Sequence, residues 1–119
     1  MLEKATWEEI TLLRLAPGEE VTVLAVRDLA LGTLVRVTTA FPGEQSGNCY
    51  LFEITDPKTY RAHVVRCDPR GPNSAGYRGE KVISSLLRIG DQVLLGGKKG
   101  VAYTSAVAGI TILEKEVLS

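Results

Sequence analysis

The segment from Cys49 to Cys67 constrains the fold more than any other part of the sequence. Two runs rich in β-branched and aromatic residues, 49–55 and 60–67, flank the sequence Asp56-Pro57-Lys58-Thr59. Runs of this composition favour strands, and proline directly after aspartate is typical of a type I turn. We therefore expect a β-hairpin in which Cys49 lies opposite Arg66 or Cys67, depending on the register.

A short helix is expected near the N-terminus. Thr6-Trp7-Glu8-Glu9 has the S/T-x-x-E form of a capping box, and the helix must end before Pro17-Gly18. A helix of a few turns is unstable alone, so it has to pack on the rest of the chain. The side chains expected to face inward are those of Trp7, Ile10 and Leu13, with Leu12 left open.

The segment between this helix and the hairpin has the composition of strands. Val21 to Ala40 is rich in valine, threonine and leucine. Asp28 to Gly32 interrupts it, either as a hairpin turn or as a bulge in one long bent strand, and Gly32 suits both. A loop over Pro42 to Gly47 then leads into the hairpin.

The C-terminal half is expected to contain a loop, a helix and two more strands. Asp68 to Gly79 has the proline and glycine content of a long polar loop. Glu80 to Ile89 carries an apolar stripe at Val82, Ile83, Leu86 and Leu87, which predicts a helix that ends at Gly90. The strands are expected at 92–95 and 101–113, on either side of a glycine-rich loop at 96–100.

This order of elements predicts a single all-β domain over residues 1–119. The expected fold is a five-stranded OB-type barrel, with one capping helix between strands 3 and 4 and a short N-terminal helical segment. A chain of 119 residues has room for one core. If Asp28 to Gly32 forms a true turn, the alternative is a six-stranded SH3-like or sandwich arrangement.

The composition is that of a globular protein without a membrane segment. Hydrophobic residues make up 45% of the chain, but they form only short runs, too short to span a bilayer. The first residues lead into Glu8 and Glu9 rather than an apolar stretch, so we expect no signal peptide and a cytoplasmic location. The small number of Asn, Gln, Met and Cys residues is also a feature of thermophilic proteins.

Charge is segregated along the chain although the formal net charge is zero. Residues 1–57 carry four positive and nine negative side chains, whereas residues 58–99 carry nine positive and three negative ones. A local positive field can attract a polyanion while the average is neutral. The neutral total instead favours a protein-interaction module or a subunit of a larger complex, which is the alternative function.

Three segments are similar to motifs of one protein family. Leu15 to Val23 contains Leu-Ala-Pro-Gly, like an L-x-P-G lead into a first strand. Phe52 to Pro57 is like a strand that enters a D-x-T-G hairpin, and Leu87 to Leu95 is like the L-x-x-G-D-x-V entry to a fourth strand. Over residues 10–113 the chain therefore resembles the OB-fold single-stranded DNA-binding proteins of the archaeal, replication-protein-A-like kind. The resemblance implies binding of single-stranded nucleic acid, with DNA preferred to RNA.

In OB folds the second and third strands and the flanking loops bind the ligand. A single-strand binder needs aromatic rings on which bases stack, at about 1–3 kcal/mol per base, and cations that neutralise phosphates. One face of every barrel strand is core, so Phe52 and one tyrosine are also core candidates. The candidate binding residues are Tyr50, Phe52, Tyr60, Arg61, His63, Arg66, Arg70, Tyr77, Arg78, Lys98 and Lys99.

No cluster of residues indicates catalysis, a cofactor or a bound metal. His63 has no serine or cysteine placed beside it as a nucleophile, so a structural role is expected. Cys49, His63 and Cys67 lack the paired spacing of a zinc site, and Gly96 to Gly100 lacks the helix that follows a phosphate loop. The sequence leaves a Cys49–Cys67 disulfide open, because the hairpin allows it and a reducing cytosol disfavours it.

Overall fold

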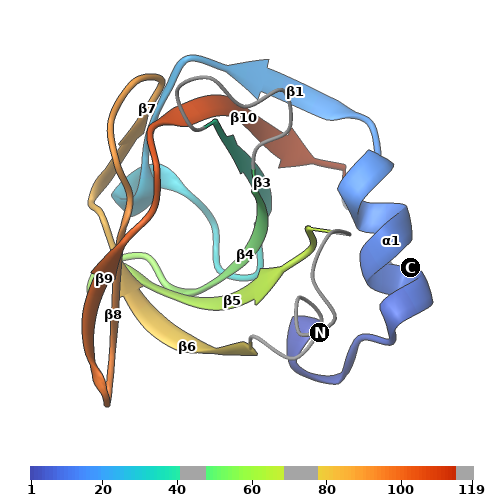
Figure 1. The fold of residues 1–119 in the computed structure, drawn as a ribbon, viewed down its shortest axis with the longest axis horizontal. Helices are drawn as coiled ribbons and strands as arrows, with labels where there is room; N and C mark the ends of the chain where they lie inside the picture. Colours follow the sequence, from blue (N-terminus) through green and yellow to red (C-terminus); the bar gives the residue numbers. More distant parts are fainter. Residues whose placement is uncertain (41–47, 69–77, 115–119) are drawn as a thin grey trace.

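One curled antiparallel sheet forms most of the structure (Figure 1). The computed structural model describes residues 1–40, 48–68 and 78–114. The strands of this sheet are β1 Gly18–Val21, β3 Leu34–Thr39, β4 Cys49–Asp56, β5 Arg61–Arg66, β6 Arg78–Ile83, β8 Leu94–Gly97, β9 Gly100–Tyr103 and β10 Val107–Leu113. Their order across the sheet is β1-β10-β3-β4-β5-β6-β8-β9, so the last long strand lies between β1 and β3.

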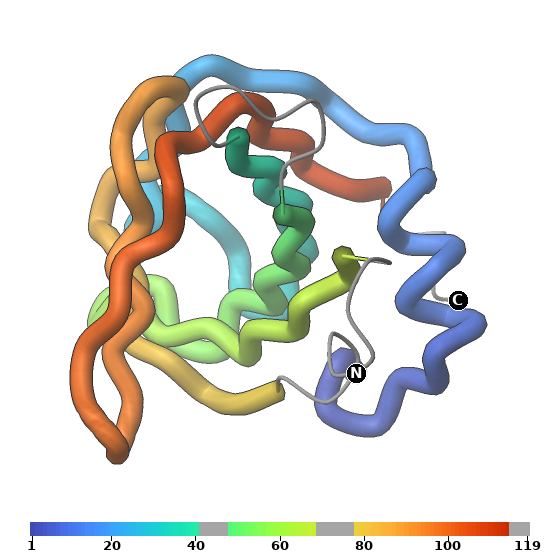
Figure 2. Tube along the Cα trace, in the orientation of Figure 1, coloured from blue at the N-terminus to red at the C-terminus, as the bar shows by residue number. Residues whose placement is uncertain are grey.

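A second, two-stranded sheet links distant parts of the first one. It consists of β2, Val23–Ala25, and β7, Leu86–Arg88, in antiparallel register. β2 follows β1 after Thr22 alone, and β7 follows β6 after Ser84 and Ser85. Two bent segments of the chain therefore take part in both sheets, which gives the chain the ring-like path seen in Figure 2.

The β-rich architecture, the central hairpin and the N-terminal helix are confirmed. β4 and β5 pair directly, with Tyr50 opposite Arg66, and Cys67 N donates to Cys49 O at 2.9 Å. The helix α1 spans Trp7–Leu15, and Thr6 Oγ1 accepts a hydrogen bond from Glu9 N at 3.2 Å, as the capping box predicts. The sheet has eight strands and open edges at β1 and β9, so a five-stranded barrel is not confirmed.

The prediction of a helix over Glu80 to Ile89 is wrong. These residues form the end of β6, a bend at Ser84 and Ser85, and β7. Ile83 and Leu87 are buried in the core, and a bent strand satisfies the same apolar spacing as a helix. β5 and β2 supply the strand hydrogen bonds from distant parts of the sequence. Tertiary pairing therefore overrides the local helical pattern.

The end of that segment and the strand after it also differ from expectation. Gly90 does have a positive φ, 94°, but it follows a strand and not a helix, and its N–H donates to Val107 O at 2.8 Å. The long strand expected over 101–113 is divided into β9 and β10. The buried Thr104 lies at the break, where its Oγ1 accepts from Val93 N at 3.0 Å.

Asp28 to Gly32 forms neither a hairpin turn nor a bulge. A 3-10 turn, η2, spans Val26–Asp28, and a turn with Gly32 at φ 84° follows it. The strands on either side do not pair with each other, since β2 pairs with β7 while β3 pairs with β10 and β4. The loop expected at Pro42 to Gly47 and most of the one at Asp68 to Gly79 lie outside the described residues.

The sheet is buried on both faces along the first half of β4. Inside the curl, Phe52, Ile54 and Val64 belong to one core cluster. On the outer face, Leu51 and Val65 pack in a second cluster with α1 and with the 3-10 turn η1, Leu2–Lys4. Figure 1 shows α1 lying against the sheet on the side away from β8 and β9. The described residues contain no helix with the length and hydrophobicity needed to cross a membrane.

The inward face of α1 is narrower than expected. Ile10 and Leu13 are buried, but the Trp7 side chain is 42% exposed and Leu12 is 68% exposed. Arg36 holds the end of the helix, because its Nη1 donates to Leu13 O at 3.0 Å and to Ala16 O at 2.7 Å. Burial lowers the pKa of the Arg36 guanidinium, and the nearby Glu20 partly opposes that shift.

Candidate functional site

The aromatic residues predicted to stack bases are mostly in the core. Tyr50 and Phe52 are buried inside the curled sheet, with ring centroids 6.5 Å apart. Tyr60 is partly buried against the same core and has a positive φ of 58° in the β4–β5 turn. The core alternative therefore holds for Phe52 and Tyr50, and neither ring is open to a base.

Two of the predicted arginines have structural partners. Arg66 Nη2 lies 3.2 Å from Asp68 Oδ2, and its guanidinium lies 6.0 Å from the centre of the Tyr50 ring. Arg78 donates to three carbonyl oxygens at the N-terminus, those of Leu2, Glu3 and Ala5, at 3.3, 3.1 and 2.6 Å. These contacts tie β6 to the N-terminal segment. Arg70 and Tyr77 lie outside the described residues.

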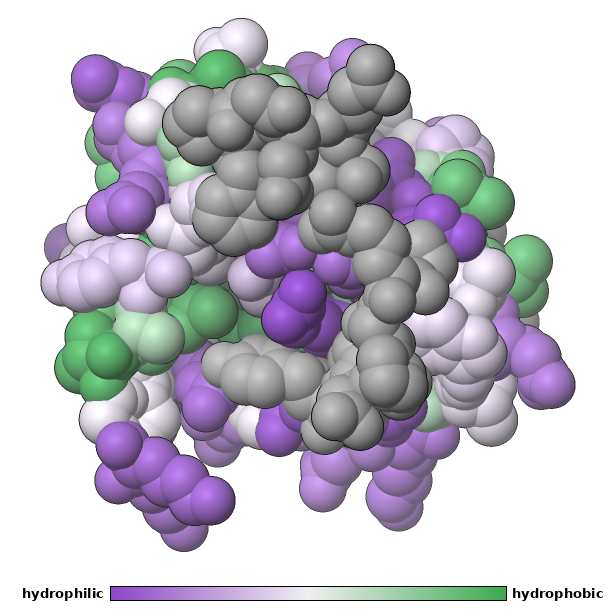
Figure 3. Space-filling view, in the orientation of Figure 1, coloured by the Kyte–Doolittle hydropathy of each residue, from purple (hydrophilic) through white to green (hydrophobic). Residues whose placement is uncertain are grey.

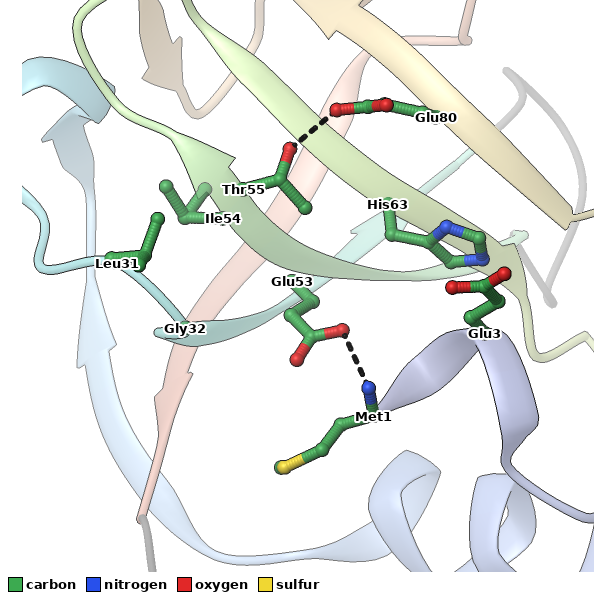
Figure 4. A pocket seen from close by; sticks show the side chains of 9 residues that line it. All are labelled: Met1, Glu3, Leu31, Gly32, Glu53, Ile54, Thr55, His63 and Glu80. Atoms are coloured by element: carbon green, nitrogen blue, oxygen red, sulfur yellow. Dashed lines mark hydrogen bonds and ion pairs between the residues drawn. The ribbon is translucent and has the colours of Figure 1, made fainter.

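His63 lies in an acidic hollow on the outer face of the sheet (Figure 4). Cross-strand pairing places it between Glu53 of β4 and Glu80 of β6, and Glu3 completes the carboxylate lining of a space of about 410 Å³. The His63 Nε2 atom is buried without a hydrogen-bond partner among the described residues. Glu3, Glu53 and Glu80 disfavour a phosphate beside His63.

Three contacts anchor the carboxylates of this hollow. Thr55 Oγ1 donates to Glu80 Oε1 at 2.9 Å, Leu2 N donates to Glu53 Oε1 at 3.1 Å, and the Met1 amine lies 3.4 Å from the same Glu53 oxygen. Within the described ranges, no three His, Cys, Asp or Glu side chains are grouped closely enough to hold a metal ion. Cys49 and Cys67 are bonded to each other as a disulfide, with Cα atoms 5.1 Å apart.

The remaining predicted cations meet at a groove on the outer face of the sheet. Register places Arg61, Val82, Gly96 and Val101 in one row across β5, β6, β8 and β9. Residues opposite each other share a face, and Ala62 beside Arg61 is in the core, so this row points outward. The space above the row is about 570 Å³. We call it the Gly96 groove. It is lined by Arg61, Glu80, Val82, Leu94, Gly96, Gly97, Lys98 and Val101.

Gly96 opens the groove because it leaves a gap between the side chains of Val82 and Val101. A Cβ atom built on Gly96 would lie 3.5 Å from Val82 O and 3.8 Å from Val82 Cβ, so the position is roomy. Arg61 and Lys98 add positive charge to this apolar floor, and the exposed Lys99 follows in the β8–β9 turn. Glu80 lies between the groove and the acidic hollow, since it lines both.

The turn between β4 and β5 positions Arg61. Lys58 N donates to Asp56 Oδ1 at 3.1 Å, and Asp56 is paired with Arg61 across a register shift. A hydrogen bond from the Thr59 side chain is the main cause that lowers the pKa of Asp56, and the Lys58 and Thr59 backbone and Arg61 lower it further. The ionised carboxylate therefore holds the turn that leads into the groove.

The β8–β9 hairpin carries exposed apolar residues that the sequence analysis missed. Val101 is 66% exposed and Tyr103 is 64% exposed on the edge strand β9. Figure 3 shows a hydrophobic region over this hairpin, at the lower left, above a hydrophilic tip. Val82 was expected in a helix, and Val101 and Tyr103 were expected in one long strand, so the sequence analysis did not place these three residues near one another. The hairpin itself was expected, with its loop at 96–100, and the pairing of β8 with β9 confirms it, although β8 extends to Gly97 and β9 begins at Gly100.

Comparison of the chain with models of protein families, with curated protein sequences and with solved structures finds no match. What the site can do must therefore come from its own geometry.

Proposed function

We propose that this protein is a non-catalytic binder of single-stranded nucleic acid, DNA in preference to RNA, and that the Gly96 groove is its contact surface. One observation carries the proposal: Arg61 of β5 and Lys98 of the β8–β9 turn, far apart in the sequence, line the same open, apolar-floored groove. The curled antiparallel sheet and its cationic hairpin tip support an OB-type binding surface, although the sheet has eight strands and not five.

The groove offers the two kinds of contact that a single strand needs. Arg61, Lys98 and Lys99 neutralise backbone phosphates. Bases pack on the aliphatic floor and on the exposed ring of Tyr103, which shares a strand face with Val101. A stacked base contributes about 1–3 kcal/mol by substitution. Contacts of this kind carry little sequence specificity, because every base has a flat face.

A protein-interaction module is the second candidate function. The observation that favours it is the open edge of β9, with Val101 and Tyr103 both exposed. An exposed apolar edge binds protein by strand addition, with affinity that depends only weakly on salt. The two functions therefore differ in salt dependence as well as in ligand.

The test is fluorescence anisotropy of a labelled, mixed-sequence single strand of about 20 nucleotides, longer than the roughly 4–16 that one such domain covers. Both DNA and RNA are titrated at low and at moderate salt. Lys98→Glu with Lys99→Glu should weaken binding more than about tenfold and flatten the salt dependence, because each lost phosphate contact removes about 0.7 from the log–log slope. Lys4→Glu is the control, since Lys4 is exposed in η1 and does not line the groove.

Absence of binding at low salt, where electrostatic attraction is strongest, overturns the nucleic-acid proposal and leaves protein partners. Equal losses in the tip variant and in Lys4→Glu would mean that binding follows overall charge and not the groove.

A further inference from the structure

One carboxylate lies among the cations of the Gly96 groove. Glu80 of β6 lines the groove together with Arg61, Val82 and Lys98, and its side chain is exposed. It shares the outer face of the sheet with Val82, because residues two apart on a strand point to the same side. A carboxylate repels a phosphate. A strand bound in the groove must therefore place a base, and not its backbone, beside Glu80.

The Glu80 carboxylate is held in position by Thr55. Thr55 Oγ1 donates to Glu80 Oε1 at 2.9 Å, and Figure 4 shows the Glu80 side chain reaching toward Thr55 while the His63 ring points away from it. Among the described residues, Thr55 is the only hydrogen-bond or ion-pair partner of this carboxylate. An ionised carboxylate accepts hydrogen bonds at both oxygens, so Glu80 keeps acceptor capacity for the donors of a ligand.

We propose that Glu80 selects guanine among the bases of a strand bound in the groove, an inference that rests on the proposed function. Proteins read unpaired bases by hydrogen bonds to their Watson–Crick edges. Guanine presents two adjacent donors there, N1–H and the N2 amino group, which match the two oxygens of one carboxylate. Each other base places an acceptor beside its donor: N3 in cytosine, N1 in adenine and the carbonyl oxygens in thymine. A carboxylate has no donor for these acceptors, so guanine gains most from Glu80.

Arg61 fits the same base from the neighbouring position. Arg61 is opposite Val82 and Glu80 is opposite His63, so Arg61 and Glu80 are diagonal neighbours on the outer face. Diagonal neighbours are about 7–8 Å apart, within reach of long side chains. Guanine carries the O6 acceptor next to N1–H, which matches a guanidinium donor beside a carboxylate acceptor. Adenine has the opposite order, a donor at N6 and an acceptor at N1, so the same pair of side chains opposes it.

Base substitution in the ligand tests this selection. Fluorescence anisotropy at low salt compares labelled DNA strands of about 20 nucleotides that contain thymine alone, or thymine with isolated guanines, adenines or hypoxanthines. Isolated guanines avoid four-stranded structures. The guanine strand should bind about tenfold more tightly than the thymine strand, as one good bidentate contact allows. Hypoxanthine keeps N1–H and O6 but lacks the N2 amino group, so its strand should lose most of that gain.

A matched pair of variants assigns the preference to one carboxylate. Glu80→Gln keeps an oxygen for the Thr55 hydroxyl but removes the charge and one acceptor. This variant should bind the thymine strand at least as tightly as the wild type, and its preference for guanine should be lost. Glu3→Gln makes the same change of charge at an exposed residue that lines the acidic hollow and not the groove. It should keep the preference, and melting temperatures check that both variants are folded.

The outcomes separate this inference from the function on which it rests. Equal affinity of the wild type for all of the strands overturns the selection of guanine and leaves the single-strand binder standing. A guanine preference that survives in Glu80→Gln, or that is lost equally in Glu3→Gln, overturns it as well. If none of the strands binds at low salt, the proposed function itself fails, and the selection of guanine fails with it.

Discussion

At the scale of single residues, the groove depends on a side chain that is missing. Gly96 stands between Val82 and Val101 in a four-strand row, and any larger residue there would fill the space between them. Its φ is outside the left-handed region, so glycine is not required by the backbone. Glycine at position 96 therefore keeps the groove open, and the backbone conformation does not require it.

Gly96→Val should fill the groove without harming the protein. Its Cβ would make only ordinary contacts with Val82, and valine has a higher strand propensity than glycine. We expect the melting temperature to stay the same or rise, while single-strand affinity falls about tenfold, close to the value of one stacked base. Ala108→Val, at an exposed position of β10 outside the groove, should leave affinity unchanged. Equal affinity for wild type and Gly96→Val would show that the ligand does not enter the groove.

The sequence predicted which cations are exposed better than it predicted which aromatic rings are exposed. Arg61, Lys98 and Lys99 are exposed as expected, because charged side chains remain in water almost anywhere on a strand or turn. The continuous apolar run at Tyr50, Leu51 and Phe52 does not show which face is outward. Both faces are buried here, since α1 covers the outer one. A distant helix cannot be inferred from the strand itself.

At the scale of elements, α1 is attached through one narrow face. Leu13 is fully buried against the sheet, whereas its neighbour Leu12 is 68% exposed. Leu13→Ala should therefore lower the free energy of unfolding by about 2–5 kcal/mol, as for other buried leucines. Leu12→Ala, the same substitution one residue away, should change it by no more than about 0.5 kcal/mol. Urea denaturation measures both, and similar losses in the two variants would contradict this packing of the helix.

The β4–β5 hairpin is closed at its open end by the Cys49–Cys67 disulfide, which links residues 18 apart in the chain. A crosslink over a loop of this length stabilises the fold by about 3 kcal/mol, by restricting the unfolded chain. Cys49→Ala with Cys67→Ala should lose about that amount in urea denaturation. Wild-type protein reduced before unfolding should lose a similar amount, whereas unchanged stability in both cases would show that the bond contributes little.

The central hairpin was predictable and the following segment was not, for a physical reason. The Asp56-Pro57 turn is local chemistry, and it fixes the pairing of the strands beside it. The spacing of Val82, Ile83, Leu86 and Leu87 fits one face of a helix. It also fits a strand that bends at Ser84, with Ile83 and Leu87 in the core. β5 and β2 decide between these structures, and no local pattern reveals those partners.

At the scale of the whole molecule, charge and topology act together. The sequence separates an acidic first half from a basic stretch at 58–99. The fold then divides one outer face between an acidic hollow around His63 and the cationic Gly96 groove, with Glu80 at the boundary. A molecule with zero net charge can in this way present a local attraction for phosphates.

Backbone amide chemical shifts of isotope-labelled protein, titrated with an unlabelled single strand of DNA at low salt, test the central claim most directly. We predict that shifts change along the row across β5, β6, β8 and β9, at Arg61, Val82, Gly96 and Val101, and in the Lys98–Lys99 turn. The amide chemical shifts of α1 and of β1 should not change. Changes confined to the hollow around His63 or to the face of α1, or no changes when the strand is in excess, would contradict the account.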